Sequence, residues 1–310
     1  MKKDFISIHD ISLYEFHEIL DMAVRIKADP HHYHKALKNK VLAMIFQKPS
    51  LRTRMTFEVG MLELGGHAVY LSPSDGQVGA RESFYDVGKN LERWVHGIMI
   101  RTFAHQNIID LAAAVEIPVI NALSDLLHPC QAMADFLTLK EKAGDLSKLK
   151  LAYVGDGNNV CHSLMFAAAK AGCAMAVATP AGYEPNPQIV KLAREDGKDT
   201  GFSLILTSEP HQAVTGADAV YTDTWTSMGQ EAEKEARVRV FSPFQVNRGL
   251  MALAKKSAFF MHCLPAHRGD EVTDEVMDSP GSLVFDQAEN RLHIQKVIMV
   301  LLMGKTEKNG

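Results

Sequence analysis

Short apolar runs alternate with helical patterns along almost the whole chain, and this alternation constrains the fold more than any other feature. Helices that alternate with short apolar strands are typical of βαβ units, whose parallel sheets are covered on both faces. The runs expected to form strands are Val41–Phe46, His67–Leu71, Gly97–Arg101, Pro118–Asn121, Lys150–Val154, Ala174–Thr179, Ser203–Thr207, Ala217–Thr222 and Ala258–Cys263. The chain is therefore predicted to be an α/β protein with parallel sheets.

The length of 310 residues allows two domains, and two sheets fit this length better than one. A helix near Cys130–Lys142 is expected to cross between them, and the polar stretch Lys142–Lys148 is the expected boundary. The last predicted helix, Ala288–Met303, is delimited separately and could pack on either half. The predicted domains are therefore residues 1–142 and 143–287, followed by a C-terminal helical segment at 288–310.

Composition excludes several classes of partner. The net charge of −4 provides no general attraction for nucleic acid or a membrane. The N-terminal segment Met1–Asp10 becomes polar too soon for a signal peptide, and the longest apolar run, Val297–Met303, is far shorter than the roughly 20 residues that span a bilayer. The four cysteines are far apart and contain no Cys-x-x-Cys pair, so reduced thiols and a cytoplasmic location are expected.

One histidine cluster invites a metal assignment. His31, His32 and His34 lie close together, but no acidic residue or cysteine accompanies them. A solvated loop is therefore favoured, and neither a bound metal nor a cofactor is predicted.

The segment Gln47–Arg54 has the features of a phosphate-binding turn. It joins an apolar strand to a helical pattern that begins near Thr53, with Met55, Val59 and Leu62 on one stripe. Backbone N–H groups and the helix dipole at such a turn favour an oxyanion, and arginine side chains match its oxygens. From this segment alone, a Ser-capped helix with two solvated arginines fits about equally well.

Polar clusters follow most of the predicted strands, where ligands of parallel α/β sheets bind. The position of any one cluster would be weak evidence, but all of them fall at carboxyl ends of strands. The clusters are Gln47–Arg54, Arg101, Asp125–Gln131, Gly155–Asn159, Asp223–Gly229 and His262–Gly269.

Four of these segments resemble the signatures of the ornithine carbamoyltransferases. Ser50–Arg54 and His128–Gln131 are similar to motifs of the wider carbamoyltransferase group, which includes the aspartate enzymes. Asp223…Ser227-Met228-Gly229 and His262–Pro265 point to ornithine as the acceptor. The resemblance implies a first domain that binds carbamoyl phosphate, a second that binds L-ornithine, a final helix that returns to the first domain, and a homotrimer or a multiple of trimers.

The resemblance also implies residue roles. Leu51 contributes only its backbone N–H and stands where the family usually has Thr, so one hydroxyl donor is lost. Gln77 reaches a neighbouring subunit's site. The residues implied to bind carbamoyl phosphate are Ser50, Leu51, Arg52, Thr53, Gln77, Arg101, His128, Gln131, Cys263, Leu264 (through its carbonyl) and Arg291. Those implied to bind ornithine are Asn159, Asp223, Ser227 and Met228. The implied catalytic residues are Arg101, His128, Asp223 and Cys263.

The expected chemistry suits such a site. The δ-amine of ornithine must be neutral to attack, and the carbonyl already carries a phosphate leaving group. No covalent nucleophile is needed, so the protein positions the substrates and stabilises charge. The leaving phosphate can accept the proton of the amine.

Other functions remain open from the residues themselves. Gly155–Val160 resembles a dinucleotide fingerprint, but Val160 replaces the third glycine and no acid follows Ala174–Thr179 to hold a ribose. Cys263 with nearby histidines could indicate a thiol hydrolase, or it could be a small buried hydrophobic residue. A binding protein without catalysis is the alternative from another class. Within the family, Asp223 suits a cationic acceptor rather than aspartate, and putrescine or an acylated ornithine fits less well.

Overall fold

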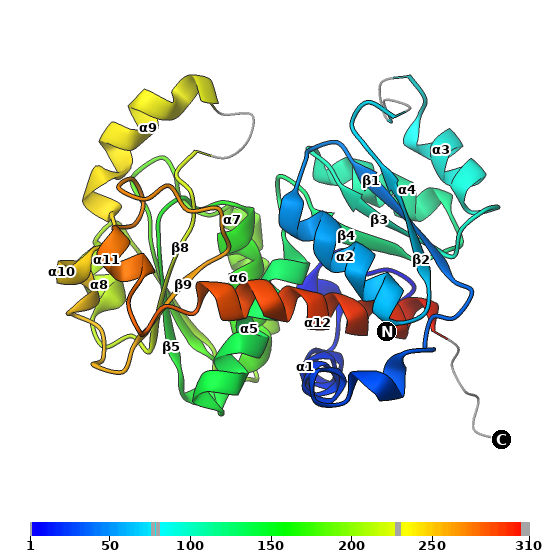
Figure 1. Cartoon of the computed structure of the whole chain (residues 1–310). Coiled ribbons are helices and arrows are strands. Elements are labelled where there is room, and N and C mark those ends of the chain that lie inside the picture. Colours follow the sequence, from blue (N-terminus) through cyan, green and yellow to red (C-terminus); the bar gives the residue numbers. More distant parts are fainter. Residues whose placement is uncertain (1, 76–77, 79–80, 227–230, 305–310) are drawn as a thin grey trace. The chain divides into compact units, whose positions relative to one another are not determined.

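The computed structural model describes residues 2–75, 78, 81–226 and 231–304, which form two compact units (Figure 1). Unit 1 consists of Met1–Leu137 and Glu289–Gly310, and unit 2 consists of Thr138–Ala288. Each unit contains a parallel sheet flanked by helices, so the predicted α/β fold class is confirmed.

The sheet of unit 1 has four parallel strands in the order β2-β1-β3-β4. Phe46 at the end of β1 pairs in register with Arg101 at the end of β3. The connections from β1 to β2 and from β3 to β4 run toward opposite edges, so the switch point of the sheet lies between β1 and β3. The strands are β1 (Val41–Phe46), β2 (His67–Leu71), β3 (Gly97–Arg101) and β4 (Val119–Leu123).

Several helices of unit 1 begin at serine caps. Ser12 forms a capping box with Glu15, and Ser50 and Ser83 accept backbone N–H groups of the first turns of their helices. The helices are η1 (Ile8–Asp10), α1 (Leu13–Ala28), η2 (Pro30–Tyr33), α2 (Leu51–Glu63), α3 (Phe84–Leu91) and α4 (His105–Ala114), together with most of α5 (Pro129–Ala143) and of α12 (Val284–Met303), within which the division between the units falls.

The sheet of unit 2 has five parallel strands in the order β7-β6-β5-β8-β9. Its switch point lies between β5 and β8, because the chain moves from β5 toward β7 and then returns to β8 on the other side. Tyr153 of β5 and Tyr221 of β8 pair in register and stack with ring centroids 5.9 Å apart. The strands are β5 (Lys150–Val154), β6 (Ala174–Ala178), β7 (Ser203–Thr207), β8 (Ala219–Thr222) and β9 (Phe259–His262).

Apolar side chains on both faces of the central strands form the core of unit 2. In helix α6 every residue from Val160 to Ala171 is buried, and most of them are apolar, although His162, Ser163 and Lys170 are polar. The helices are η3 (Leu146–Lys148), α6 (Asn159–Ala171), α7 (Pro187–Asp196), α8 (Pro210–Val214), η4 (Glu231–Glu233), α9 (Lys234–Phe241), η5 (Ser242–Phe244), α10 (Arg248–Met251) and α11 (Asp274–Met277).

Two helix predictions were inaccurate. Helix α12 begins at Val284 rather than Ala288, because residues 284–287, two apolar and two polar, already form its first turn. Helix α2 begins at Leu51 rather than near Thr53, and two members of its predicted apolar stripe, Met55 and Leu62, are exposed. Its buried side is instead formed by Thr53, Phe57, Gly60 and Met61. The histidine cluster is exposed as predicted, although Pro30–Tyr33 forms a short 3₁₀ helix rather than a loop.

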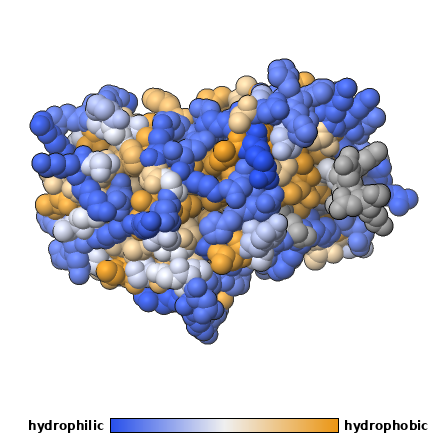
Figure 2. All heavy atoms as spheres, turned by 90° about the horizontal axis from the view of Figure 1, so that it is seen from below, coloured by the Kyte–Doolittle hydropathy of each residue, from blue (hydrophilic) through white to orange (hydrophobic). Residues whose placement is uncertain are grey.

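The surface in Figure 2 is mostly hydrophilic, with small scattered hydrophobic patches on the face shown. Within the described part of the chain, no helix has both the length and the apolar character needed to cross a membrane.

Candidate active site

The predicted phosphate turn lies at the switch point of the unit 1 sheet. Ser50 has an extended backbone and caps α2, with its Oγ accepting the Thr53 N–H at 3.3 Å. The turn follows β1, beside the end of β3 that carries Arg101. The first turn of α2 and its dipole therefore lie where ligands of parallel sheets bind.

The two arginines of this turn have different surroundings. Arg54 donates from Nε to Glu58 Oε2 at 3.2 Å, and its Cζ lies 3.9 Å from the Tyr70 ring centroid. Its side chain is 45% exposed. Arg54 therefore behaves as the solvated arginine that the simpler interpretation expected. Arg52 is half-buried, and Leu51 at the helix start is 74% exposed.

Four polar side chains of unit 1 form a buried cluster at this edge of the sheet. Thr53 is fully buried, and Arg101, His128 and Arg291 are 7%, 5% and 3% exposed. Arg291, from α12, donates from Nη2 to Thr53 Oγ1 at 2.7 Å. A site with two buried guanidinium groups favours an anion, because charge removed from water needs compensation.

His128 is held in its neutral form. Burial lowers its pKa well below the usual 6.5, and the charges of Arg291 and Arg101 lower it further. The two arginines therefore lie close enough to act on one imidazole ring. A neutral imidazole can donate one hydrogen bond to a carbonyl oxygen without adding a third positive charge.

Gln131 provides an acceptor beside this cluster. Its side chain is 1% exposed, and its Nε2 donates to Asp135 Oδ1 at 2.8 Å. Within the described residues, Gln131 Oε1 has no hydrogen-bond partner. A buried amide oxygen without a donor is costly, so this atom is suited to accept from the NH2 group of a ligand.

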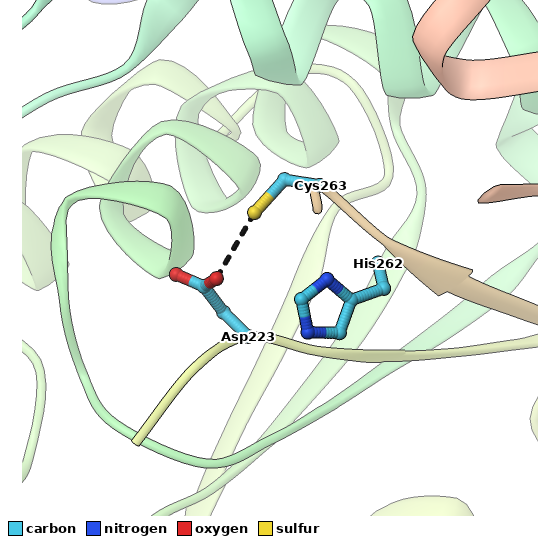
Figure 3. A group of neighbouring side chains, drawn as sticks. All are labelled: Asp223, His262 and Cys263. Carbon is cyan, nitrogen blue, oxygen red and sulfur yellow. Dashed lines mark hydrogen bonds between the residues drawn. The ribbon is translucent and has the colours of Figure 1, made fainter. Parts of the chain in front are cut away.

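In unit 2, Asp223 and Cys263 come together at the ends of neighbouring strands (Figure 3). Asp223 follows β8 and is 6% exposed, whereas Cys263 follows β9 and is half-buried. The Cys263 Sγ–H donates to Asp223 Oδ1 at 3.0 Å. Asp223 Oδ2 accepts from Asn158 Nδ2 at 2.7 Å. This arrangement presents a hydrogen-bonded carboxylate at the switch point of the second sheet.

Asn159 lies at the first position of α6 and is half-buried. The side chain that links this turn to Asp223 is the preceding residue, Asn158, which the sequence analysis did not single out. Asn158 is recognisable from the sequence as a cap, because asparagine often precedes a helix. Its contact with Asp223, which lies 65 positions further along the chain, cannot be recognised from the neighbouring sequence.

His262 belongs to a group that could hold a metal ion. One potential ligand atom from each of Asp223, His262 and Cys263 lies within 4.8 Å of the others. However, His262 Nδ1 accepts the Leu264 N–H at 2.8 Å, and its Nε2 lies 3.2 Å from Glu271 Oε1. Both ring nitrogens are therefore engaged, and the imidazole would have to give up one of these bonds to bind a metal.

The same contacts weigh against the thiol hydrolase. The Cys263 thiol donates to the Asp223 carboxylate, and both ring nitrogens of the neighbouring His262 are engaged with Leu264 and Glu271, so His262 is poorly placed to remove the thiol proton. His262 instead supports the backbone of Leu264, which has a φ of 60°, in the left-handed region. Such a conformation in a non-glycine residue is often found at functional sites.

The glycine pattern after β5 has a packing explanation. A Cβ on Gly157 would lie 2.3 Å from the Pro185 backbone nitrogen and 2.5 Å from the Glu184 carbonyl carbon. Gly157 also donates its N–H to Tyr183 O at 2.9 Å. Glycine is required here because two chain segments approach each other closely, so the dinucleotide fingerprint loses its main support.

Asp156 and Arg237 form a second interaction that the sequence analysis missed. Arg237 Nη2 donates to Asp156 Oδ2, and its guanidinium group lies 4.7 Å from the Tyr183 ring centroid. Burial raises the pKa of Asp156 to about 6, against the opposing effect of Arg237. The pair anchors α9 to the turn that carries Asn158.

Three of the predicted site residues, Gln77, Ser227 and Met228, lie outside the described residues. Their roles remain predictions.

Two parallel α/β units, each with a polar cluster at the switch point of its sheet, suit an enzyme that binds two small substrates, and comparison with family models identifies the class. Residues 3–141 match the carbamoyl-P binding domain of aspartate/ornithine carbamoyltransferase, and residues 147–302 match its Asp/Orn binding domain. The chain belongs to the aspartate/ornithine carbamoyltransferase family, which confirms the predicted resemblance.

Relatives within this family match almost the whole chain. The ornithine carbamoyltransferase of Thermococcus kodakarensis is 52% identical over 307 residues, covering 97% of this chain and 96% of the relative. The anabolic ornithine carbamoyltransferase of Pyrococcus furiosus is 50% identical, with the same coverage. A solved structure of the Pyrococcus furiosus ornithine carbamoyltransferase has a TM-score of 0.94 and 51% identity, covering 97% of this chain and 96% of that one.

Proposed function

We propose that this protein transfers the carbamoyl group of carbamoyl phosphate to the δ-amine of L-ornithine, giving L-citrulline and phosphate in arginine biosynthesis. The observation that carries the choice of acceptor is the buried Asp223 carboxylate, held by Cys263 and Asn158 at the carboxyl edge of the unit 2 sheet. A carboxylate favours a cationic amino acid and disfavours the second carboxylate of aspartate. The full-length similarity to enzymes named ornithine carbamoyltransferase supports the same assignment.

The unit 1 residues take the role of the carbamoyl-phosphate site. The first turn of α2 and the side chains of Ser50, Arg52 and Thr53 bind the phosphate oxygens. Arg101 and Arg291 balance the phosphate charge from buried positions, and Arg291 also orients Thr53 through its hydrogen bond. The backbone N–H of Leu51 adds a donor.

The same residues stabilise the transition state. Nucleophilic attack by the amine turns the carbonyl oxygen into an oxyanion, which accepts hydrogen bonds from Arg101 and the neutral His128. Gln131 Oε1 accepts from the carbamoyl NH2 group, which satisfies this otherwise unpartnered buried atom. The carbonyl of Leu264 and the thiol of Cys263 complete the set of groups that act on carbamoyl phosphate.

The unit 2 residues bind ornithine. Asn159, Asp223, Ser227 and Met228 bind its α-amino and α-carboxylate groups, and Cys263 and Asp223 also lie close to the δ-amine, a group that aspartate lacks. The neutral δ-amine forms the new C–N bond, the C–O bond to phosphate breaks, and the phosphate accepts a proton from the amine. The chemistry needs neither a covalent intermediate nor a cofactor.

The protein is proposed to act as a homotrimer or a multiple of trimers. Leu51, Met55 and Leu62 form an exposed apolar stripe on α2, with Val69 exposed on the edge strand β2. Burying this stripe against another copy would remove apolar area from water. Light scattering coupled to size-exclusion chromatography measures the subunit number, and a monomer would contradict the assembly.

A cytoplasmic location is proposed from the thiol chemistry. None of the four cysteines forms a disulfide, and Cys130, Cys161 and Cys173 are buried. Cysteines that stay in the thiol form suit a reducing compartment. Fractionation of cells that express the protein tests this location.

The function is tested by measuring citrulline formation from carbamoyl phosphate and ornithine. Aspartate, putrescine and acetylornithine serve as alternative acceptors under the same conditions. Ornithine is expected to give the highest kcat/KM. A higher kcat/KM for any of the three others would change the assigned acceptor, and no turnover with any of the four acceptors, ornithine included, would favour a binding protein.

A further inference from the structure

The Asn158 side chain has a fixed orientation because each end of its amide is used. Its Oδ1 accepts the N–H groups of Val160 at 3.0 Å and Cys161 at 3.2 Å, which caps α6. The Tyr153 hydroxyl, which donates its one proton to Asp156 O at 2.8 Å, lies 3.3 Å from the same Oδ1. With two backbone N–H donors facing the oxygen, the Nδ2 group points away from the helix.

The Nδ2 group points to Asp223. Asn158 Nδ2 donates to Asp223 Oδ2 at 2.7 Å, while Asp223 Oδ1 accepts from the Thr224 N–H at 2.8 Å and from Cys263 Sγ at 3.0 Å. Each carboxylate oxygen therefore has its own donor. Since Asp223 is 6% exposed, water cannot readily replace a lost donor.

The two residues meet at the switch point of the unit 2 sheet. Asn158 follows β5 and Asp223 follows β8, and these strands are neighbours in the sheet. Because the same amide group caps α6 and donates to Asp223, the first turn of α6 fixes the donor that the Asp223 carboxylate accepts from. A bond to a charged acceptor is also stronger than one between neutral groups.

We propose that Asn158 is a positioning residue for the acceptor substrate: by capping α6 with its oxygen and donating its amide N–H to Asp223 Oδ2, it holds this carboxylate in the orientation that receives the ornithine cation. Asn158 acts through Asp223 and needs no contact with substrate. This inference rests on the proposed role of Asp223 in ornithine binding.

The test separates the cap from the hydrogen bond to Asp223. In Asn158→Ser, the shorter side chain still accepts backbone N–H groups at an N-cap but offers no amide donor to Asp223. The KM for ornithine is expected to rise about tenfold to a hundredfold, as for a lost bond to a charged group. The KM for carbamoyl phosphate is expected to stay close to that of the original protein, and the unfolding temperature is expected to fall by no more than a few degrees, because a buried acceptor loses one donor.

Asn186→Ser is the matched control. Asn186 caps α7 in the same unit by accepting the Gln188 N–H at 2.8 Å. The Asn186→Ser substitution therefore makes the same chemical change at the cap of another helix. This variant is expected to leave both KM values unchanged. Loss of ornithine affinity in Asn186→Ser would show that cap substitutions in this unit act through general destabilisation, which would overturn the positioning role.

A double-mutant cycle with Asp223→Asn gives the decisive comparison. If Asn158 acts through Asp223, the double variant binds ornithine no more weakly than Asp223→Asn alone. Additive losses would overturn the inference, as would an unchanged ornithine KM in Asn158→Ser. If Asp223→Asn itself leaves ornithine binding intact, the proposed function of Asp223 fails, which is a separate outcome.

Discussion

Arg291 and Thr53 are joined by a buried hydrogen bond of 2.7 Å across 238 positions of sequence. The bond links the C-terminal helix α12 to the first turn of α2. The same two helices also make the Lys296–Glu63 ion pair at 2.7 Å, and a Cβ on Gly60 would lie 2.9 Å from Met299 Cε. Helix α12 thus contributes Arg291 to the buried polar cluster beside α2 as well as apolar side chains to the core of unit 1.

Replacing Arg291 with Met is therefore expected to weaken carbamoyl-phosphate binding. Removing a donor to a charged ligand costs about 1.5–3 kcal/mol, or about one to two decades in affinity. Isothermal titration calorimetry measures the dissociation constant. Lys296→Met is the control, because it breaks a pair on the same helix and should lower stability without changing this constant. An equal loss of carbamoyl-phosphate affinity in both variants would show that the effect comes from disturbed packing of α12 and would contradict a direct role of Arg291.

Arg52→Ala is expected to reduce affinity for carbamoyl phosphate by a similar amount, about one to two decades, because one set of charge-assisted donors is lost. Arg54→Ala is the matched control from the same turn. Arg54 is half-exposed and bound to Glu58, so its removal should change affinity by no more than about twofold, as for ordinary surface sites. If Arg54→Ala lost more affinity for carbamoyl phosphate than Arg52→Ala, then Arg54 rather than Arg52 would be the phosphate-binding arginine of the turn.

Asp223→Asn is expected to weaken the binding of ornithine far more than the binding of carbamoyl phosphate. The substitution keeps the shape of the side chain but removes the charge that faces the cationic substrate. Steady-state KM values for each substrate, measured at saturation of the other, provide the comparison. Equal losses for both substrates would indicate damage to the fold, and thermal unfolding of the variant detects such damage.

The depressed pKa of His128 predicts how stability depends on pH. Burial lowers the pKa of His128 in the folded protein well below its ordinary value of 6.5. As pH falls below about 6.5, the unfolded chain takes up a proton that folded His128 resists, so stability decreases. The free energy of unfolding, measured in urea at pH 7 and pH 5, should fall less in His128→Asn than in the original protein. An equal decrease would show that His128 titrates normally in the folded state.

Cysteine reactivity should be confined to Cys263. Burial raises the pKa of Cys130 and of Cys173 to about 12, and it raises that of Cys161 well above its usual value. Cys263 is half-buried, so iodoacetamide at pH 8 is expected to modify this residue first. Mass spectrometry of digested protein locates the label. Ornithine should slow the reaction, and Cys263→Ala should remain unlabelled over the same period.

The order and type of the main elements could be predicted from local patterns. Five strands, among them Val41–Phe46 and Lys150–Val154, have the predicted bounds, because short apolar runs between polar turns carry their signal within a few residues. The Ser50 cap was also visible, since a capping residue acts on the next helical turn. In α2, however, the predicted apolar stripe contains exposed Met55 and Leu62, because periodicity alone does not distinguish a side that faces the core from one that does not.

The amino-acid sequence by itself determined the parallel α/β class, the capped turn after β1 and the placement of polar residues at strand ends. Only the tertiary structure decided which of those residues meet. Arg291 contacts Thr53, and Asn158 contacts Asp223, through strand order and helix packing that bring distant positions together. Local propensities act over a few residues, whereas these bonds depend on burial, which removes water and makes each unsatisfied polar group costly.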